Sequence, residues 1–224
     1  MKKVTLSLLT LAICSTPALA HNKTTYKHPL DPLNMKSLAA LHYSDGAARA
    51  DLGLNVSPNI LARAHVTDEG SMSFGGGAVI KLSERDEWGT GLIRTGVSFG
   101  AEHNDFDEIG TKTSLDAKFV VSEYLNRQRE FLLTGNIGGR YITTDYYNVE
   151  DSKVQFIAGG SAFYVKNPLY IGASVDAAVD DETAISLTPK IGYTVNNADF
   201  NVGYQYIVEG LGEDEVSFNA TFNF

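Results

Sequence analysis

Histidines are the first residues of this sequence that could do chemistry, because an imidazole can act as a general base in hydrolysis. Of the five histidines, His42, His65 and His103 lie beyond the first 35 residues. Only His103 has close carboxylate neighbours, in the stretch EHNDFDE. Hydrolase chemistry needs a histidine beside a serine or a carboxylate in space, whereas charges on a loop often serve only to keep it soluble. We therefore predict no catalytic residues and no enzyme activity.

A second set of candidate functional residues is charged and recurs within apolar stretches. If these stretches are strands with a polar face around an aqueous lumen, the charges line that lumen. Arginine and lysine would then favour small anions, or each would pair with a carboxylate across the lumen, as Arg63 and Asp51 could. Both interpretations stay open. The predicted lumen-lining residues are Arg49, Asp51, Arg63, Lys81, Arg94, Asp116, Lys118, Arg140, Asp176 and Lys190.

Strands are the elements that must position these side chains. After residue 36, segments of alternating apolar and polar residues recur between turn residues, which predicts β-strands, and no segment has a helical period. We predict about twelve strands, with ten as the alternative. Their predicted ranges are 36–43, 47–56, 60–66, 72–82, 90–102, 111–124, 131–144, 153–165, 169–179, 183–195, 200–208 and 215–224.

The alternation within the strands predicts a barrel in a membrane. In the segment from Thr183 to Val195, apolar residues alternate with Ser186, Thr188 and Lys190. Strands of about 9 to 14 residues suit a tilted crossing of the hydrocarbon layer. With the faces reversed, Lys190 would lie near the bilayer centre at a cost of about 2–4 kcal/mol. The sequence therefore predicts an all-β, antiparallel, up-and-down transmembrane β-barrel with its polar face inward.

The connections between the predicted strands support this register. Taken alternately, one set of connections contains 16 carboxylates and no lysine or arginine, while the other includes Arg85, Arg127, Arg129 and Lys166. Such segregation predicts that the two sets lie on opposite sides of the membrane, and an even strand number places both termini in the periplasm. The acidic set would either hold divalent cations that bridge to lipopolysaccharide phosphates or simply keep the loops soluble.

The amino-terminal residues predict export. Lys2 and Lys3 precede an apolar run, and Ala18-Leu19-Ala20 supplies small residues for cleavage, so residues 1–20 have the features of a signal peptide. The one cysteine, Cys14, lies within it, so no disulfide is expected. Residues 21–35 contain two prolines and no period, which predicts a flexible lead before a barrel over residues 36–224. A net charge of −9 argues against nucleic acid as a partner, and no cofactor or metal site is expected.

The carboxyl-terminal strand carries the signal that suggests a family. Phe218, Phe222 and Phe224 occupy alternate positions of a strand that ends on an aromatic residue. This pattern resembles the signal by which Gram-negative bacteria assemble outer-membrane barrels. The stretches 48–82 and 203–224 are also similar in layout to the YfaZ family of predicted outer-membrane proteins. The resemblance implies a location in the outer membrane. The implied partners are outer-membrane lipid and lipopolysaccharide, the barrel assembly machinery and periplasmic chaperones.

Three functional classes fit a barrel of this kind. The prediction is a narrow passive pore for small solutes with a mild preference for anions, because glycine and serine at many inward positions leave room that arginine and lysine can line. The alternatives are a non-conducting structural or surface-adhesion barrel and, with less support, a hydrolase embedded in the barrel wall.

Overall fold

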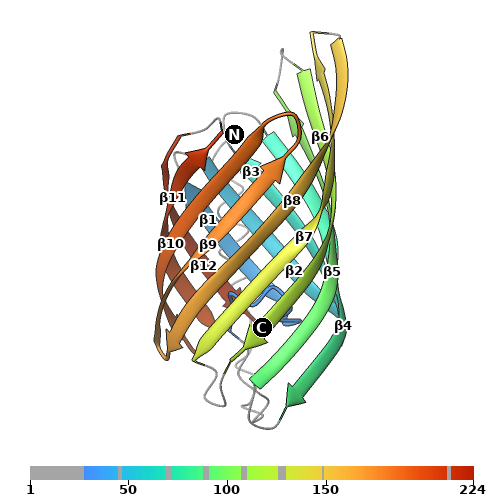
Figure 1. Ribbon diagram of the computed structural model, residues 1–224. Helices are drawn as coiled ribbons and strands as arrows, with labels where there is room; N and C mark the ends of the chain where they lie inside the picture. Colours follow the sequence, from blue (N-terminus) through green and yellow to red (C-terminus); the bar gives the residue numbers. More distant parts are fainter. Residues whose placement is uncertain are drawn as a thin grey trace, which may run out of the picture.

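The protein forms a closed barrel of twelve antiparallel strands in the computed structural model, and the part of the chain that it describes contains no helix (Figure 1). The described residues are 28–44, 47–68, 72–87, 91–106, 110–125, 130–147, 149–210 and 213–224. The prediction of twelve strands is confirmed. The strands are β1 (Leu38–Ser44), β2 (Ala47–Ser57), β3 (Ile60–Asp68), β4 (Met72–Glu87), β5 (Gly91–Asp105), β6 (Gly110–Tyr124), β7 (Phe131–Tyr146), β8 (Val149–Lys166), β9 (Leu169–Val179), β10 (Thr183–Val195), β11 (Ala198–Glu209) and β12 (Glu215–Asn223).

Each strand pairs with the next one along the chain, and β12 returns to pair with β1. The closing ladder runs from Leu38 opposite Asn223 to Ser44 opposite Ser217. Lipid offers no hydrogen bonds to an unpaired strand edge, so closure is required of any sheet that spans a bilayer. The regular alternation of the last strand thus serves two ladders at once, one to β11 and one to β1.

A proline in β12 tests the importance of this closure. Ala220 lies opposite Leu41 of β1 and Phe200 of β11. Ala220→Pro removes one ladder N–H and leaves a carbonyl unpaired, so we expect a loss of about 1–3 kcal/mol in unfolding free energy. Thermal unfolding in detergent micelles measures the effect, and Ala220→Val is the matched control because valine favours strands. Equal melting temperatures for the proline and valine variants would contradict the expectation.

The barrel has two distinct ends. The terminal end carries Phe224 and the short turns at residues 58–59, 167–168 and 196–197, and it lies at the bottom of Figure 1. The far end carries the connections that follow the odd-numbered strands, including the turn at residues 180–182 between β9 and β10. The strand order places all of the acidic connections at the far end, as the sequence predicts. Which compartment each end faces stays a prediction, and residues 45–46, 69–71, 107–109, 148 and 211–212 of these connections lie outside the described residues.

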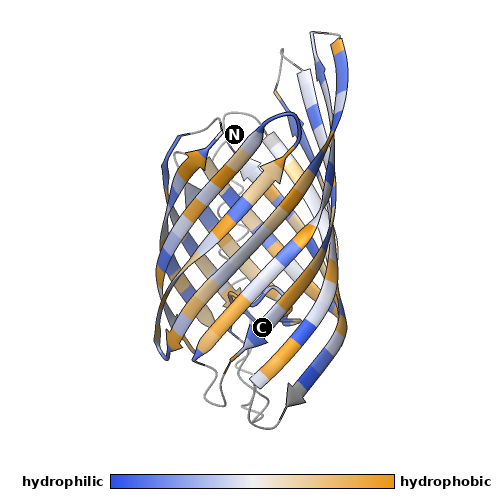
Figure 2. Ribbon diagram, viewed as in Figure 1, coloured by the Kyte–Doolittle hydropathy of each residue, from blue (hydrophilic) through white to orange (hydrophobic). Residues whose placement is uncertain are grey.

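The outer surface of the barrel is apolar, as the alternation predicts. Along β11 the side chains of Phe200, Val202 and Tyr204 are 41–45% exposed, while the intervening Asn201 is only 7% exposed. Figure 2 shows the same alternation of hydrophobic and hydrophilic positions along other strands. Aromatic pairs lie toward the terminal end, with Phe131 and Tyr164 5.0 Å apart and Phe200 and Phe222 5.8 Å apart between ring centroids. Exposed aromatic rings at such a border are typical of a membrane interface.

The wall of the barrel is uneven in height. β8 has 18 residues and β7 has 16, whereas β1 has seven. The upper parts of β6, β7 and β8 consequently rise above the rest of the far end (Figure 1). Among the described residues, no helix is long and apolar enough to cross a membrane.

Candidate functional site

The predicted lumen-lining residues fall into three groups in the structure. One group lies on the wall formed by β6, β7 and β9, where Lys118, Arg140 and Asp176 line a cavity of about 260 Å³. Asp176 also interacts electrostatically with Lys190 of β10, so the cavity has charges of both signs around it. The lining of the lumen by these residues, as a path for solutes, stays a prediction.

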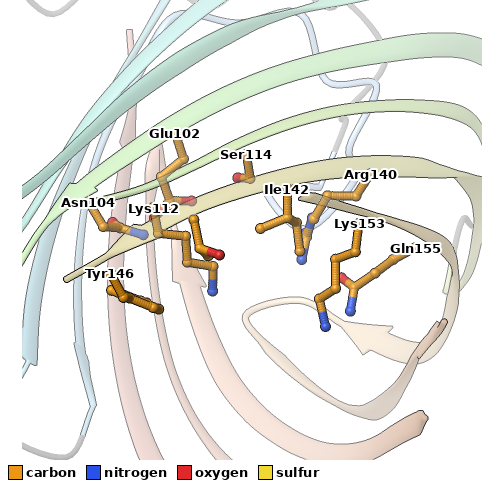
Figure 3. Close-up of a pocket in the computed structure, with 10 residues that line it drawn as sticks. Glu102, Asn104, Lys112, Ser114, Arg140, Ile142, Tyr146, Lys153 and Gln155 are labelled. Carbon is orange, nitrogen blue, oxygen red and sulfur yellow. The ribbon is translucent and has the colours of Figure 1, made fainter. Parts of the chain in front are cut away.

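Arg140 extends into a second cavity toward the far end, with a volume of about 380 Å³. Lys112 and Lys153 line this cavity with Arg140, and Glu102 lies on β5, the strand beside Lys112. The nitrogen atoms of the three cations point into the same space (Figure 3). Lys153 forms an ion pair with Asp180 at 2.7 Å. Among the described residues, no carboxylate lies within ion-pair distance of Lys112 or Arg140, so these two cations face the lumen water.

The second group lies on the opposite wall and is already paired. The side chain of Asp51 is 2.8 Å from Arg49 and 3.0 Å from His42. Arg63 influences Asp51 electrostatically, but it is not one of these direct partners, in contrast to the pair expected from the sequence. Lys81 pairs with Glu84 at 2.8 Å. On the first wall, Lys118 lies 3.8 Å from Asp116 of the same strand. Local pairing within one strand therefore neutralises much of the predicted basic excess.

His103, the candidate general base, lies on β5 near the far end. Its Nδ1 atom is 2.9 Å from the Thr113 hydroxyl oxygen, and its ring packs against Phe74 at 5.3 Å between centroids. Among the described residues, no serine and carboxylate converge on this imidazole within hydrogen-bond distance. Asp107 and Glu108, which contributed to the sequence pattern, lie outside the described residues.

Arg94 is the only member of the third group. It contacts Asp31 and Leu33, which lie in the chain segment before β1. We name residues 28–37 the inner segment. The sequence predicts a flexible lead over residues 21–35, but the structure folds residues 28–35 inside the barrel near its terminal end (Figure 1). Residues 21–27 lie outside the described residues, and the prediction of a signal peptide over residues 1–20 also falls there.

The inner segment is built from two tight turns. The Asp31 amide donates to the His28 carbonyl oxygen at 3.0 Å, and the Asn34 amide donates to the Asp31 carbonyl oxygen at 2.9 Å. The Asp31 carboxylate accepts a further bond from the Leu33 amide at 2.9 Å. Proline and aspartate favour such turns, since proline fixes one backbone angle and aspartate bonds to the backbone two residues on. The sequence HPLDPLNM thus encodes a compact turn rather than a flexible lead.

An ion pair buries the centre of the inner segment against β5. Arg94 contacts the Asp31 carboxylate directly, and both side chains are fully buried. The guanidinium group also donates to the Leu33 carbonyl oxygen at 3.2 Å and lies over the Tyr124 ring, 5.4 Å from its centroid. Arg94 is therefore a partner of the inner segment, not a freely solvated residue of the lumen.

His28 fixes the other side of the inner segment. Its amide donates to the Tyr124 hydroxyl oxygen at 2.8 Å, and its ring packs edge-on against Tyr170 at 4.7 Å. Its Nε2 atom lies 3.3 Å from the Thr194 hydroxyl, which donates to Asp199 at 2.7 Å. Burial lowers the pKa of His28 to about 4, and the nearby Asp199 carboxylate offsets only part of this effect.

Apolar contacts complete the packing of the terminal end. Leu33 and Met35 pack with Leu61, Val79 and Val120, while Leu30 packs against a second cluster that includes Leu92, Leu132 and Phe163. Gly96 leaves room for Leu33, because a Cβ atom at this position would lie 2.6 Å from the leucine side chain. Sequence reasoning missed these residues. The two leucines and Met35 beside Asp31 were the only local sign that the lead could be buried.

A closed antiparallel sheet with an apolar outer surface and a charged lumen defines the fold as that of a transmembrane β-barrel. No protein-family model matches the sequence, and a comparison with curated proteins gives no significant match.

Solved structures show to which barrels the fold is similar. The chain resembles the COG4313 outer membrane channel from Pseudomonas putida F1, with a TM-score of 0.57, 10% identity, and 89% of this chain and 100% of that chain covered. It also resembles the KdgM porin and the NanC porin, each with a TM-score of 0.52 and 12% identity. These two matches cover 84% of this chain and 99% and 98%, respectively, of the other chain. Similarity at this level of identity shows the fold, not the solute.

Proposed function

We propose that this protein is an outer-membrane channel for small solutes with a mild preference for anions. The observation that carries the proposal is the pair of cavities that Arg140 lines in common, where Lys112 and Arg140 have no carboxylate within ion-pair distance among the described residues. A fixed positive charge in a narrow lumen attracts anions and repels cations. The porin and channel folds of the similar structures support the general class.

The location and orientation belong to the same proposal. A signal peptide over residues 1–20 exports the chain, and Phe218, Phe222 and Phe224 direct its assembly in the outer membrane. The terminal end faces the periplasm, and the acidic far end faces lipopolysaccharide. The resemblance to the YfaZ family stays a prediction, because the similar structures support an outer-membrane barrel and not that family.

The ion preference is tested by the reversal potential of the purified protein in a planar bilayer under a salt gradient. We expect a potential of anion sign that falls toward zero in Arg140→Ser, since this substitution removes the cation shared by both cavities. Asp176→Asn is the matched control. It removes a negative charge from the same wall and should increase the anion preference. Currents without selectivity, or equal potentials in both variants, would contradict the anion preference but leave a channel in place.

A non-conducting structural barrel is the second candidate function. The observation that favours it is the inner segment, whose buried residues fill the terminal end of the lumen. Absence of current in every variant that still folds would support this candidate over the channel.

A further inference from the structure

The inner segment contacts the lumen wall around most of its circumference. The side-chain amide of Asn55 on β2 donates to the Met35 carbonyl oxygen. The backbone amide of Asn55 donates to the Ser37 hydroxyl oxygen at 3.0 Å. Arg94 of β5, Tyr124 of β6 and Thr194 of β10 hold the other contacts. The inner segment thus lies across the lumen rather than along one wall.

The two ends of the lumen differ sharply in packing. His28 and Leu33 are 0% exposed and Asp31 is 2% exposed, so the terminal end is filled by side chains. The cavities beside Arg140, above this level, are in contrast open spaces lined by charged, polar and apolar residues together. The charged lumen is accordingly open toward the far end and shut at the terminal end.

The Ser37 carbonyl oxygen, at the end of the inner segment, accepts a hydrogen bond from the Phe224 amide at 2.9 Å beside the closing ladder, whereas residues 28–35 make no backbone–backbone hydrogen bond to a strand among the described residues. All twelve ladders join strand to strand, and the turns of the inner segment use hydrogen bonds within that segment. Residues 28–35 continue into β1 through residues 36–37, so they can leave the lumen as a unit without opening a ladder. Side chains of the wall hold residues 28–35, through the buried Asp31–Arg94 ion pair, the buried His28 and bonds to backbone atoms of the segment.

We propose that the inner segment is a gate of the channel. In its docked position it closes the terminal end of the lumen, and solutes pass when it undocks. This inference rests on the proposed channel function, because a gate has meaning only where a pore conducts. Asp31 and Arg94 form the latch, and Leu30, Leu33 and Met35 are the apolar body that excludes water.

The test compares the full chain with two variants in a background that replaces Cys14. In one, residues 28–35 are exchanged for the same number of glycines and serines, and in the other Leu33→Asp places a charge in the apolar packing. Both changes lie outside the twelve strands, and heat-modifiable gel mobility confirms that the barrel folds. We expect conductance in planar bilayers to rise at least about tenfold in both variants, which corresponds to a shift in a closed-to-open equilibrium by the same factor.

A second readout reports docking without any current. Ser122 is fully buried on β6 between Val120 and Tyr124, both of which contact the inner segment. A maleimide should therefore label Ser122→Cys slowly in the full chain and rapidly in both variants. Ser114→Cys, which lines the open cavity, should label rapidly in every case.

The combined results separate the gate from the channel. Higher conductance together with faster labelling of Ser122→Cys supports the gate. Equal conductance in the full chain and the variants overturns the gate and leaves the channel intact. Labelling that accelerates in barrels that never conduct overturns the channel and, with it, the gate.

Discussion

Arg94→Leu should open the channel more than any other single substitution in its wall. The replacement leaves the Asp31 carboxylate buried without its cation, because the two side chains pair in a site that excludes water. Removing one partner of a buried ion pair costs about 3–5 kcal/mol. This cost makes docking of the inner segment less favourable, because the carboxylate of Asp31 regains contact with water once the inner segment leaves the lumen. At about 1.4 kcal/mol per factor of ten, the equilibrium constant for docking should fall by about two to four orders of magnitude.

A double substitution distinguishes a latch from a residue that merely stabilises β5. Buried ion pairs can often be exchanged for apolar residues of similar volume without loss of stability. We therefore expect Arg94→Leu combined with Asp31→Leu to restore both low conductance and slow labelling of Ser122→Cys. Arg49→Leu removes a different arginine of the lumen, one that pairs with Asp51, and should leave the labelling rate unchanged. Additive effects of the two leucine substitutions would contradict a direct latch.

Acidification should also release the inner segment. Burial lowers the pKa of His28 to about 4 from its ordinary value of 6.5, so docking favours the neutral imidazole. Docking is then fully favourable above pH 6.5 and weakens as the pH falls from 6.5 toward about 4. The loss reaches up to about 3 kcal/mol, because each unit of pKa shift corresponds to about 1.4 kcal/mol. Conductance measured from neutral pH down to about pH 4.5 should rise steeply over this window.

His28→Asn identifies the titrating group. Asparagine still offers a polar side chain near Thr194 but carries no proton that titrates in this range. Among the described residues of the strands, the groups that face His28 include Tyr124 of β6, Tyr170 of β9, Thr194 of β10 and Asp199 of β11. Asp199→Asn is the control for a carboxylate that responds to acid at the same place. A pH response that survives in His28→Asn and disappears in Asp199→Asn would assign the switch to Asp199.

The strands could be predicted from the sequence because lipid on one side and water on the other impose a period of two residues. The predicted ranges 169–179 and 183–195 agree with β9 and β10 residue for residue. β4 and β8 are longer than predicted, since β4 continues to Glu87 and β8 begins at Val149. These added residues include Glu84, Arg85, Glu150 and Asp151. Charged residues of this kind lack the apolar alternation, although the backbone ladder continues through them.

The inner segment could not be predicted in the same way, because distant residues hold it in place. Its partner Arg94 lies about 60 positions further along the sequence, and Thr194 lies 166 positions from His28. No local period records such contacts. The alternation predicts an inward position for Arg94 on its strand, but the pattern gives no information about what fills the lumen beside it.

The uneven height of the wall has a consequence for the membrane itself. At about 3.3 Å per residue and a tilt of about 40°, a strand with the length of β1 rises only about 18 Å across the membrane. The apolar belt of an outer-membrane barrel is about 25 Å tall. β3 and β12, with nine residues each, belong to the same low side, while β7 and β8 stand opposite.

The bilayer beside the low side must therefore become thinner, or the whole barrel must tilt toward that side. Either change costs roughly a fraction of a kcal/mol per Å of mismatch between the apolar belt and the bilayer. If the low sides of two such barrels met, the barrels would share one thinned region. Fewer lipid molecules would then be deformed. The bilayer should thus draw neighbouring copies together along β1 and β12, without any contact between their side chains.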